Sequence, residues 1–319
     1  CVPETGWNSS IWNPHVSDDV AAAAPAAAAA TAGGVAWAAV GSGAGTGGGR
    51  GVKLVSPQEE VLRQQAVATV FSRFQASVLG KELGIRAKNE MFERWQFSQK
   101  LKEGRGGDPI LPAKAFFDPA LDAELQELGV HKTQARNLCC ELGRASKSSL
   151  KTLTRQLRVG GGSSSKRAVA KRPDDNTYVL QLGKNRRVSG RGEDKGLLRM
   201  NSAHYEKMRE LFRRARGYGG ATGREKETPA SSRTSPGGGD LESGWTADFH
   251  DRLFACLMRY EALQGGGFQA SVDGDTFDVL LRHFGVKMEC FASPFNCRYA
   301  RYCSAFADTD KPFGRWVLV

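Results

Sequence analysis

Residues 286–313 read VKMECFASPFNCRYARYCSAFADTDKPF, and the rest of the chain is interpreted around this stretch. Residues 286–292 are mostly apolar and follow a helical pattern that closes on Gly285, which predicts a buried strand. Ser293-Pro294 ends the strand because proline lacks a backbone donor, and Asn296 follows in the turn. Open α/β sheets bind ligands beyond the carboxyl ends of their strands. The pattern therefore indicates either a ligand-binding turn or an ordinary strand and turn in a core.

The segment ECFASPFNCRYARYCSAFADTD, residues 289–310, resembles a stretch of the phosphorylated-CTD-interacting factor family, the cap-specific adenosine N6-methyltransferases. In that family the segment reads approximately as a strand, then A-S-P-x-N-C, then Y-C-S-A-F-x-D-T-D. The resemblance implies a Rossmann-like methyltransferase domain with S-adenosylmethionine as cofactor. It also implies capped mRNA with a cap-adjacent 2'-O-methyladenosine as substrate, association with the phosphorylated C-terminal domain of RNA polymerase II, and a nuclear location.

The turn after the predicted strand supplies the cofactor-binding candidates Ala292, Ser293, Pro294 and Asn296. We expect them to form one wall of the S-adenosylmethionine pocket. Asn296 offers one acceptor and two donors, which suit the ribose, the adenine or the amino-acid end of the cofactor. The alternative is that Asn296 only ties down the turn through backbone hydrogen bonds, as asparagine often does.

The composition limits the classes of partner that the protein is expected to bind. The 319 residues carry a net charge of +11 with a pI of about 9.4, which favours nucleic acid, although a basic protein without such a partner remains an alternative. The seven cysteines show no CxxC pair and no zinc spacing with histidine, so we expect reduced thiols and no metal site. No apolar run has the length of a membrane span. Because the sequence opens on Cys1 rather than methionine, we expect a fragment of a longer protein.

Residues 1–55 are of low complexity and we expect them to be disordered. The G-x-G-x-x-G match at residues 43–48 is a chance result of dense glycine, because no helix opens at its last glycine. Trp7 and the Trp12-Asn13-Pro14 triplet are similar to the end of a WW module, but their spacing does not support that domain.

Residues 56–159 predict a helical domain and an RNA-binding candidate. Ser56-Pro57 is a helix start, and further helices are expected over 86–101, with Met91, Trp95 and Leu101 inward, over 119–128 and over 133–157. The last of these helices is strongly basic. Its cations form either a solvated face or the lining of a phosphate channel: Arg136, Arg144, Lys147, Lys151, Arg155 and Arg158.

Phe92-Glu93-Arg94-Trp95, followed by Gly107-Asp108-Pro109 and Leu111-Pro112, is similar to the F-E-R-W … D-P-L-L-P segment of the same family. The resemblance implies that Arg94 contacts the substrate RNA, and arginine suits that role because it binds phosphate with two hydrogen bonds. The alternative is a surface ion pair with Glu90. A second arginine of the family falls near Ala123, where this sequence departs from the pattern.

The remaining segments predict an α/β fold with a large helical portion. We expect strands at 177–182 and 197–200, a helix over 203–216, an amphipathic helix over 248–263 and another ending at Phe284. The expected divisions are a linker over 160–176, short strands and a helix over 177–216, a disordered linker over 217–243, and the incomplete start of the Rossmann-like methyltransferase domain over 244–319.

Catalysis is the weakest part of the resemblance. The N-P-P-F motif with which the family holds the adenine amine does not occur in this sequence, so we assign no catalytic residue and expect no activity from the chain as written. Asp308 and Asp310 are expected to order their loop rather than act as an acid/base pair. The alternative function is a non-catalytic RNA- or polymerase-binding module.

Overall fold

The computed structural model describes residues 55–78, 84–104, 106–114, 117–160, 166–183, 197–216, 238–263 and 273–314. Nearly all of the low-complexity segment 1–55, most of the expected linker 217–243 and the residues after Gly314 lie outside these ranges. The helices are α1 (Pro57–Ser77), α2 (Ile85–Glu103), α3 (Pro119–Glu127), α4 (Lys132–Gly160), α5 (Ser202–Ala215), α6 (Gly238–Glu261), α7 (Gly274–Phe284) and α8 (Ala307–Asp310), followed by a 3-10 turn at Lys311–Phe313. The strands are β1 (Ala168–Asp174), β2 (Thr177–Leu182), β3 (Leu197–Asn201), β4 (Met288–Glu289) and β5 (Arg301–Tyr302).

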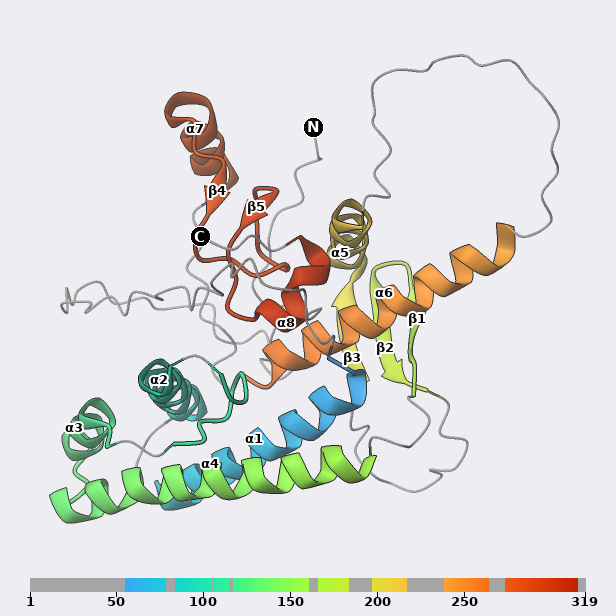
Figure 1. Ribbon diagram of the computed structural model, residues 1–319. Coiled ribbons are helices and arrows are strands. Elements are labelled where there is room, and N and C mark those ends of the chain that lie inside the picture. The colour runs from blue at the N-terminus through green and yellow to red at the C-terminus, as the bar shows by residue number, and fades with distance from the viewer. Residues whose placement is uncertain are drawn as a thin grey trace, which may run out of the picture.

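The four helices predicted within residues 56–159 are present as α1 to α4. The Ser56 side chain caps α1 by accepting from the Glu59 backbone N–H at 3.2 Å, with Pro57 in the first turn. Helices α1 and α4 lie side by side (Figure 1). Their apolar faces form a first core together with residues of α2 and α3. Leu101 was expected to point inward and is instead 48% exposed. It lies near the end of α2, beyond the part of the helix that packs on this core.

A three-stranded antiparallel sheet follows, in the order β1-β2-β3. The predicted strands at 177–182 and 197–200 are confirmed as β2 and β3, whereas β1 lies inside the segment expected to be a linker. One face of the sheet packs on α6 and α5 and forms a second core with them. The Asp251 carboxylate of α6 fixes the first strand by accepting from the Ala168 N–H at 2.7 Å.

A buried charge cluster joins the first core to the C-terminal segment. The guanidinium of Arg259, on α6, is fully buried and donates to Glu60 of α1 at 2.7 and 2.8 Å and to Asp308 of α8 at 2.9 and 3.0 Å. Arg63 donates to the same Glu60 and, at 2.8 Å, to Asp108. Burial is the largest influence on Asp308 and opposes its ionisation, but the hydrogen bonds and the positive charge of Arg259, together with Arg63, outweigh it and lower the pKa of this carboxyl.

The neighbouring Asp310 has a different environment. It is fully buried and accepts from the Tyr260 hydroxyl at 2.8 Å and from the Thr309 hydroxyl at 3.0 Å. Burial raises the pKa of Asp310. Both aspartates are thus held by side chains of their own fold, which confirms that the Asp-Thr-Asp sequence orders its loop.

The buried strand expected over 286–292 is wrong in length and in burial. Only Met288–Glu289 forms β4, which pairs in parallel with β5. Phe291 is 69% exposed, and α7 buries none of its described side chains. The physical reason is that a strand is buried only where other layers cover both of its faces. Within the described ranges α7 projects away from the body, so it does not supply such a layer (Figure 1).

The described residues contain neither a helix that could span a membrane nor a cluster that could hold a metal. None of their helices has both the length and the apolar character needed to cross a membrane. No group of three or more His, Cys, Asp and Glu side chains in these ranges is placed to hold a metal ion.

We expect Arg259→Ala to destabilise the protein strongly, because it leaves Glu60 and Asp308 without their shared cation in a buried site. The expected loss in free energy of unfolding is about 3–5 kcal/mol. Urea titration followed by circular dichroism measures it. Arg282→Ala is the matched control, since Arg282 forms an exposed pair with Asp278 on α7 and should cost below about 1 kcal/mol. Similar losses for the two variants would contradict a structural role of the buried cluster.

Candidate functional site

Helix α4 carries a row of exposed cations along one side. Their spacing of three and four residues repeats with the helical turn, so they project from the same part of the helix surface: Arg144, Lys147, Lys151, Arg155 and Arg158. We call these five residues the α4 row. Glu141 is the only acidic residue of α4. In the described part of the chain, no ion pair is formed by any member of the row.

A hollow of about 520 Å³ between α1 and α4 adds another cation to this surface. Its lining includes Arg73 and Ser77 from α1 and Arg144 and Ser148 from α4. Arg73 is exposed and therefore lies on the same surface as the beginning of the α4 row. This proximity could not be predicted from the sequence, because the two helices are far apart along the chain.

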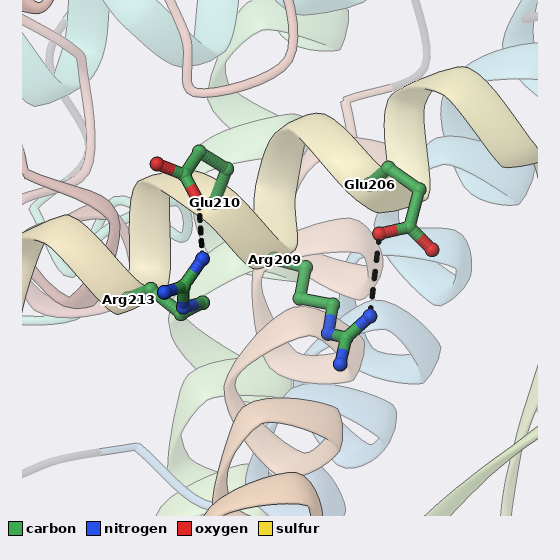
Figure 2. Close-up of a pocket in the computed structure, with 4 residues that line it drawn as sticks. All are labelled: Glu206, Arg209, Glu210 and Arg213. Carbon is green, nitrogen blue, oxygen red and sulfur yellow. Dashed lines mark hydrogen bonds and ion pairs between the residues drawn. The ribbon is translucent and has the colours of Figure 1, made fainter. Parts of the chain in front are cut away.

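The arginines of α5 differ from those of α4. Arg209 lies 3.5 Å from Glu206, and Arg213 lies 2.9 Å from Glu210. These four residues line a hollow of about 360 Å³, and Figure 2 shows each arginine turned toward a glutamate of its own helix. Two cations and two carboxylates give the hollow no net charge. It is therefore a weaker candidate for binding an anion than the α4 row.

Arg94 lies on α2, and its guanidinium is occupied by a residue of another helix. Its Nε and Nη2 atoms donate to the two carboxylate oxygens of Glu124, on α3, at 3.1 and 2.8 Å. The hydrogen bonds to Glu124 raise the pKa of Arg94. This two-pronged contact, rather than the alternative pair with Glu90, holds the guanidinium in the geometry in which arginine also binds phosphate. The pair is partly exposed, with 54% of the Arg94 side chain accessible.

The Arg94 surface also contains a carboxyl group that titrates near neutrality. Burial and the neighbouring Glu90 raise the pKa of Glu93 to about 7. The sequence did not single out Glu93 or Glu124. The only sequence signal for Glu124 is its position one residue after Ala123, near which the family has an arginine.

The predicted cofactor turn is closed on itself. Ser293 is 5% exposed, and its N–H and hydroxyl both donate to the Asn296 side-chain oxygen, the hydroxyl at 2.9 Å. The Ser293 carbonyl accepts in turn from the N–H groups of Asn296 and Cys297. Ala292, which precedes the turn, is bonded through its N–H to the Cys303 carbonyl at 3.0 Å. Asn296 thus orders the turn, as the structural alternative expected, and its role toward a cofactor stays a prediction.

Two side chains that the sequence did not reveal hold this turn. Lys207, on α5, donates to the Phe295 carbonyl at 2.8 Å, and burial lowers the pKa of Lys207. Glu289, at the end of β4, accepts from the N–H groups of Arg298 and Tyr299 at 2.6 and 2.7 Å. Arg94 and the turn lie on separate cores, so the structure does not bring the predicted site residues together.

Comparisons with known proteins match the C-terminal part of the chain. Residues 239–316 match the family model described as "Phosphorylated CTD interacting factor 1 WW domain". A stretch of 72 residues is 46% identical to proteins named "mRNA (2'-O-methyladenosine-N(6)-)-methyltransferase" from Homo sapiens and from Mus musculus. The match covers 21% of this chain and 10% of each relative's length.

The matched region is mainly helical where the structure describes it. It contains α6, α7, α8 and the short parallel pair β4–β5. The antiparallel sheet of the chain lies earlier, between Ala168 and Asn201. The resemblance predicted from residues 289–310 is thereby confirmed at the level of the family.

We expect Asn296→Ala to lower the stability of the ligand-free protein, because the Ser293 N–H and hydroxyl both lose their acceptor in a part-buried turn. The expected loss in free energy of unfolding is about 1–3 kcal/mol, measured by urea titration. Cys290→Ala changes an exposed neighbour on the same loop and serves as the control. If Asn296→Ala unfolds at the wild-type midpoint, the side-chain oxygen does not order the turn.

Proposed function

We propose that this chain, whose residues 239–316 match the model of the phosphorylated CTD interacting factor 1 WW domain, is part of a cap-specific adenosine N6-methyltransferase and contributes an RNA-binding surface to it. The observation that supports the RNA-binding role is the α4 row, none of whose members forms an ion pair with a carboxylate among the described residues. Positive charge that is not neutralised within the protein is available to phosphate groups and gives sequence-independent affinity. The proposed partners are capped mRNA and the phosphorylated C-terminal domain of RNA polymerase II, and the proposed location is the nucleus.

The length and regularity of the α4 row suit a nucleic-acid backbone. From Arg144 to Arg158 the helix rises by about 21 Å, at 1.5 Å per residue. A strand lying along this line passes several phosphates over the row. Arg73 widens the basic surface toward α1. Lysine and arginine are both suited to this contact, and arginine adds the two-pronged geometry.

The Ser293–Asn296 turn remains the proposed site for S-adenosylmethionine, which would supply the methyl group. The parallel pairing of β4 and β5 supports this, because parallel strands are typical of sheets that bind ligands at their carboxyl ends. The donor set fits only partly, since the Asn296 side-chain oxygen is already used by Ser293. The chain's own contribution is therefore to hold the backbone of the turn in place, with Lys207 and Glu289 as its supports.

A second measurement on the turn, beside the urea titration, is the affinity of folded wild-type and Asn296→Ala protein for S-adenosylmethionine. Weaker binding by the folded variant supports a pocket wall at residues 292–296. Unchanged affinity assigns Asn296 to the turn alone.

A non-catalytic RNA- or polymerase-binding module is the second candidate function, because the sequence contains no N-P-P-F motif. It would use the same α4 surface. Transfer of a labelled methyl group to capped RNA that begins with 2'-O-methyladenosine separates the two candidates: transfer supports the enzyme, and RNA binding without transfer supports the module.

RNA affinity should fall linearly with salt on a log–log plot, because phosphate contacts release counterions. We expect the Lys147→Ala, Lys151→Ala, Arg155→Ala triple variant to reduce the magnitude of the slope by about 2, at about 0.7 per lost phosphate contact. Fluorescence anisotropy with a single-stranded RNA measures it. The control replaces Arg213 and Arg214 by alanine on α5, where both arginines are paired with Glu210. A flat salt response, or equal changes in both variants, would contradict binding along α4.

Arg94→Ala should weaken capped-RNA binding more than Lys151→Ala, because an arginine can bind a phosphate with two parallel hydrogen bonds and a lysine cannot. The lost contact should cost about 1–3 kcal/mol. Glu124→Gln should strengthen binding, since a phosphate must displace the Glu124 carboxylate from the guanidinium. Equal effects of Arg94→Ala and Lys151→Ala would make Arg94 one charge among many.

A further inference from the structure

We propose that Phe117 and Arg136 form a platform on which one unpaired base of a bound single-stranded RNA stacks. Phe117 precedes α3 and is 44% exposed, and the guanidinium carbon of Arg136, on α4, lies 5.2 Å from the centre of its ring. The inference rests on the proposed RNA-binding function and adds a contact that recognises a base rather than a phosphate. Base stacking on aromatic rings combined with arginine is a general means of binding single strands.

The backbone at Phe117 and directly after it is held by hydrogen bonds, although the ring itself is exposed. Asp118 caps α3 by accepting from the N–H groups of Ala120 and Leu121 at 3.1 and 3.3 Å. Lys102, at the end of α2, donates to the Phe117 carbonyl at 3.3 Å. The ring is thus presented from a rigid position, which reduces the ordering cost of binding.

Exposure alone would not distinguish Phe117, because single exposed apolar residues are normal on protein surfaces. Phe284 and Phe291 are more exposed, at 72% and 69%, but within the described ranges neither ring carries a cation. The other rings with a cation over them are buried or half-buried by the fold, as Phe306 and Phe212 are. Among the described cation–ring pairs, only Phe117–Arg136 combines a cation with an exposed ring.

The platform lies in line with the α4 row. At about 100° per residue, Arg136 is about 20° from Lys147 around the helix axis and about 16 Å from it along the helix. Glu141, the acidic residue between them, is about 140° away from Arg136 around the axis. The nearby Asp118 carboxylate is 2% exposed and is occupied by Gln99 and the α3 cap. Glu141 is exposed and lines the hollow beside Arg144, so an RNA strand on the line from Lys147 to Arg136 passes this carboxylate on one side before it reaches Phe117.

The test uses the full chain and a single-stranded RNA that carries the fluorescent base 2-aminopurine, whose emission falls on stacking. We expect Phe117→Ala to weaken binding about tenfold and to remove the quenching, while the slope of the salt dependence stays at the wild-type value. Arg136→Ala should weaken binding and also reduce the magnitude of the slope by about 0.7. Phe117→Tyr keeps a ring and should restore both affinity and quenching.

Phe284→Ala is the control, since it removes a more exposed phenylalanine, on α7, that has no cation over its ring within the described ranges. The platform is overturned if wild-type protein binds the RNA and Phe117→Ala binds it with the same affinity and the same quenching. It is also overturned if Phe117→Ala and Phe284→Ala lose affinity equally. If the wild-type chain binds no RNA, the proposed function and the platform both fail. Binding of a peptide at Phe117 that leaves RNA binding unchanged would assign the ring to a different partner.

Discussion

The fold depends on one buried guanidinium. Arg259 joins α1 to α8 by forming two-pronged contacts with Glu60 and with Asp308, and the ring of Phe306 lies 5.0 Å from it. An arginine without water around it is tolerated only when its donors are occupied, and here two carboxylates occupy them. Arg63 shares Glu60 and extends the cluster to Asp108, between α2 and α3. The position of the C-terminal segment against the helical domain therefore depends on charge pairing as well as on apolar packing.

The two basic helices α4 and α5 differ in how their positive charges are paired. Arginines of α5 are matched by Glu206, Glu210 and Asp248, so their charges serve the stability and solubility of that helix. Within the described ranges the α4 row has no such partners, although α4 packs extensively on α1. A count of positive residues cannot make this distinction. It requires knowing which carboxylates are within reach of each cation, and the structure supplies that.

Much of the helical part could be predicted from sequence, because its signals are local. Ser56-Pro57 and Pro119 mark helix starts, and residues 177–182 and 197–200 are short, mainly apolar runs that form strands. The predictions failed where burial depends on distant elements. Residues 286–292 have strand composition, yet only Met288–Glu289 is a strand, because α7 does not cover the others. The contacts of Arg94 with Glu124 and of Lys207 with Phe295 join helices and loops that no short-range pattern relates. Asn296 is a third case. Its residue type indicated a polar role in the turn, but its side-chain oxygen could either bind a cofactor or order the turn, and the sequence did not decide between the two.

Helix α6 belongs to both cores, and this has a consequence for how the molecule unfolds. Its residues Phe249, Leu253 and Phe254 belong to the sheet core, Tyr260 packs against both cores, and Ala262, directly after the helix, belongs to the helical core. Two units that share a rigid element cannot lose their structure independently, because melting either core removes the partner of the other. We therefore expect the two cores to unfold together, so that a perturbation at α1 or α4 changes the opening equilibrium of the C-terminal turn.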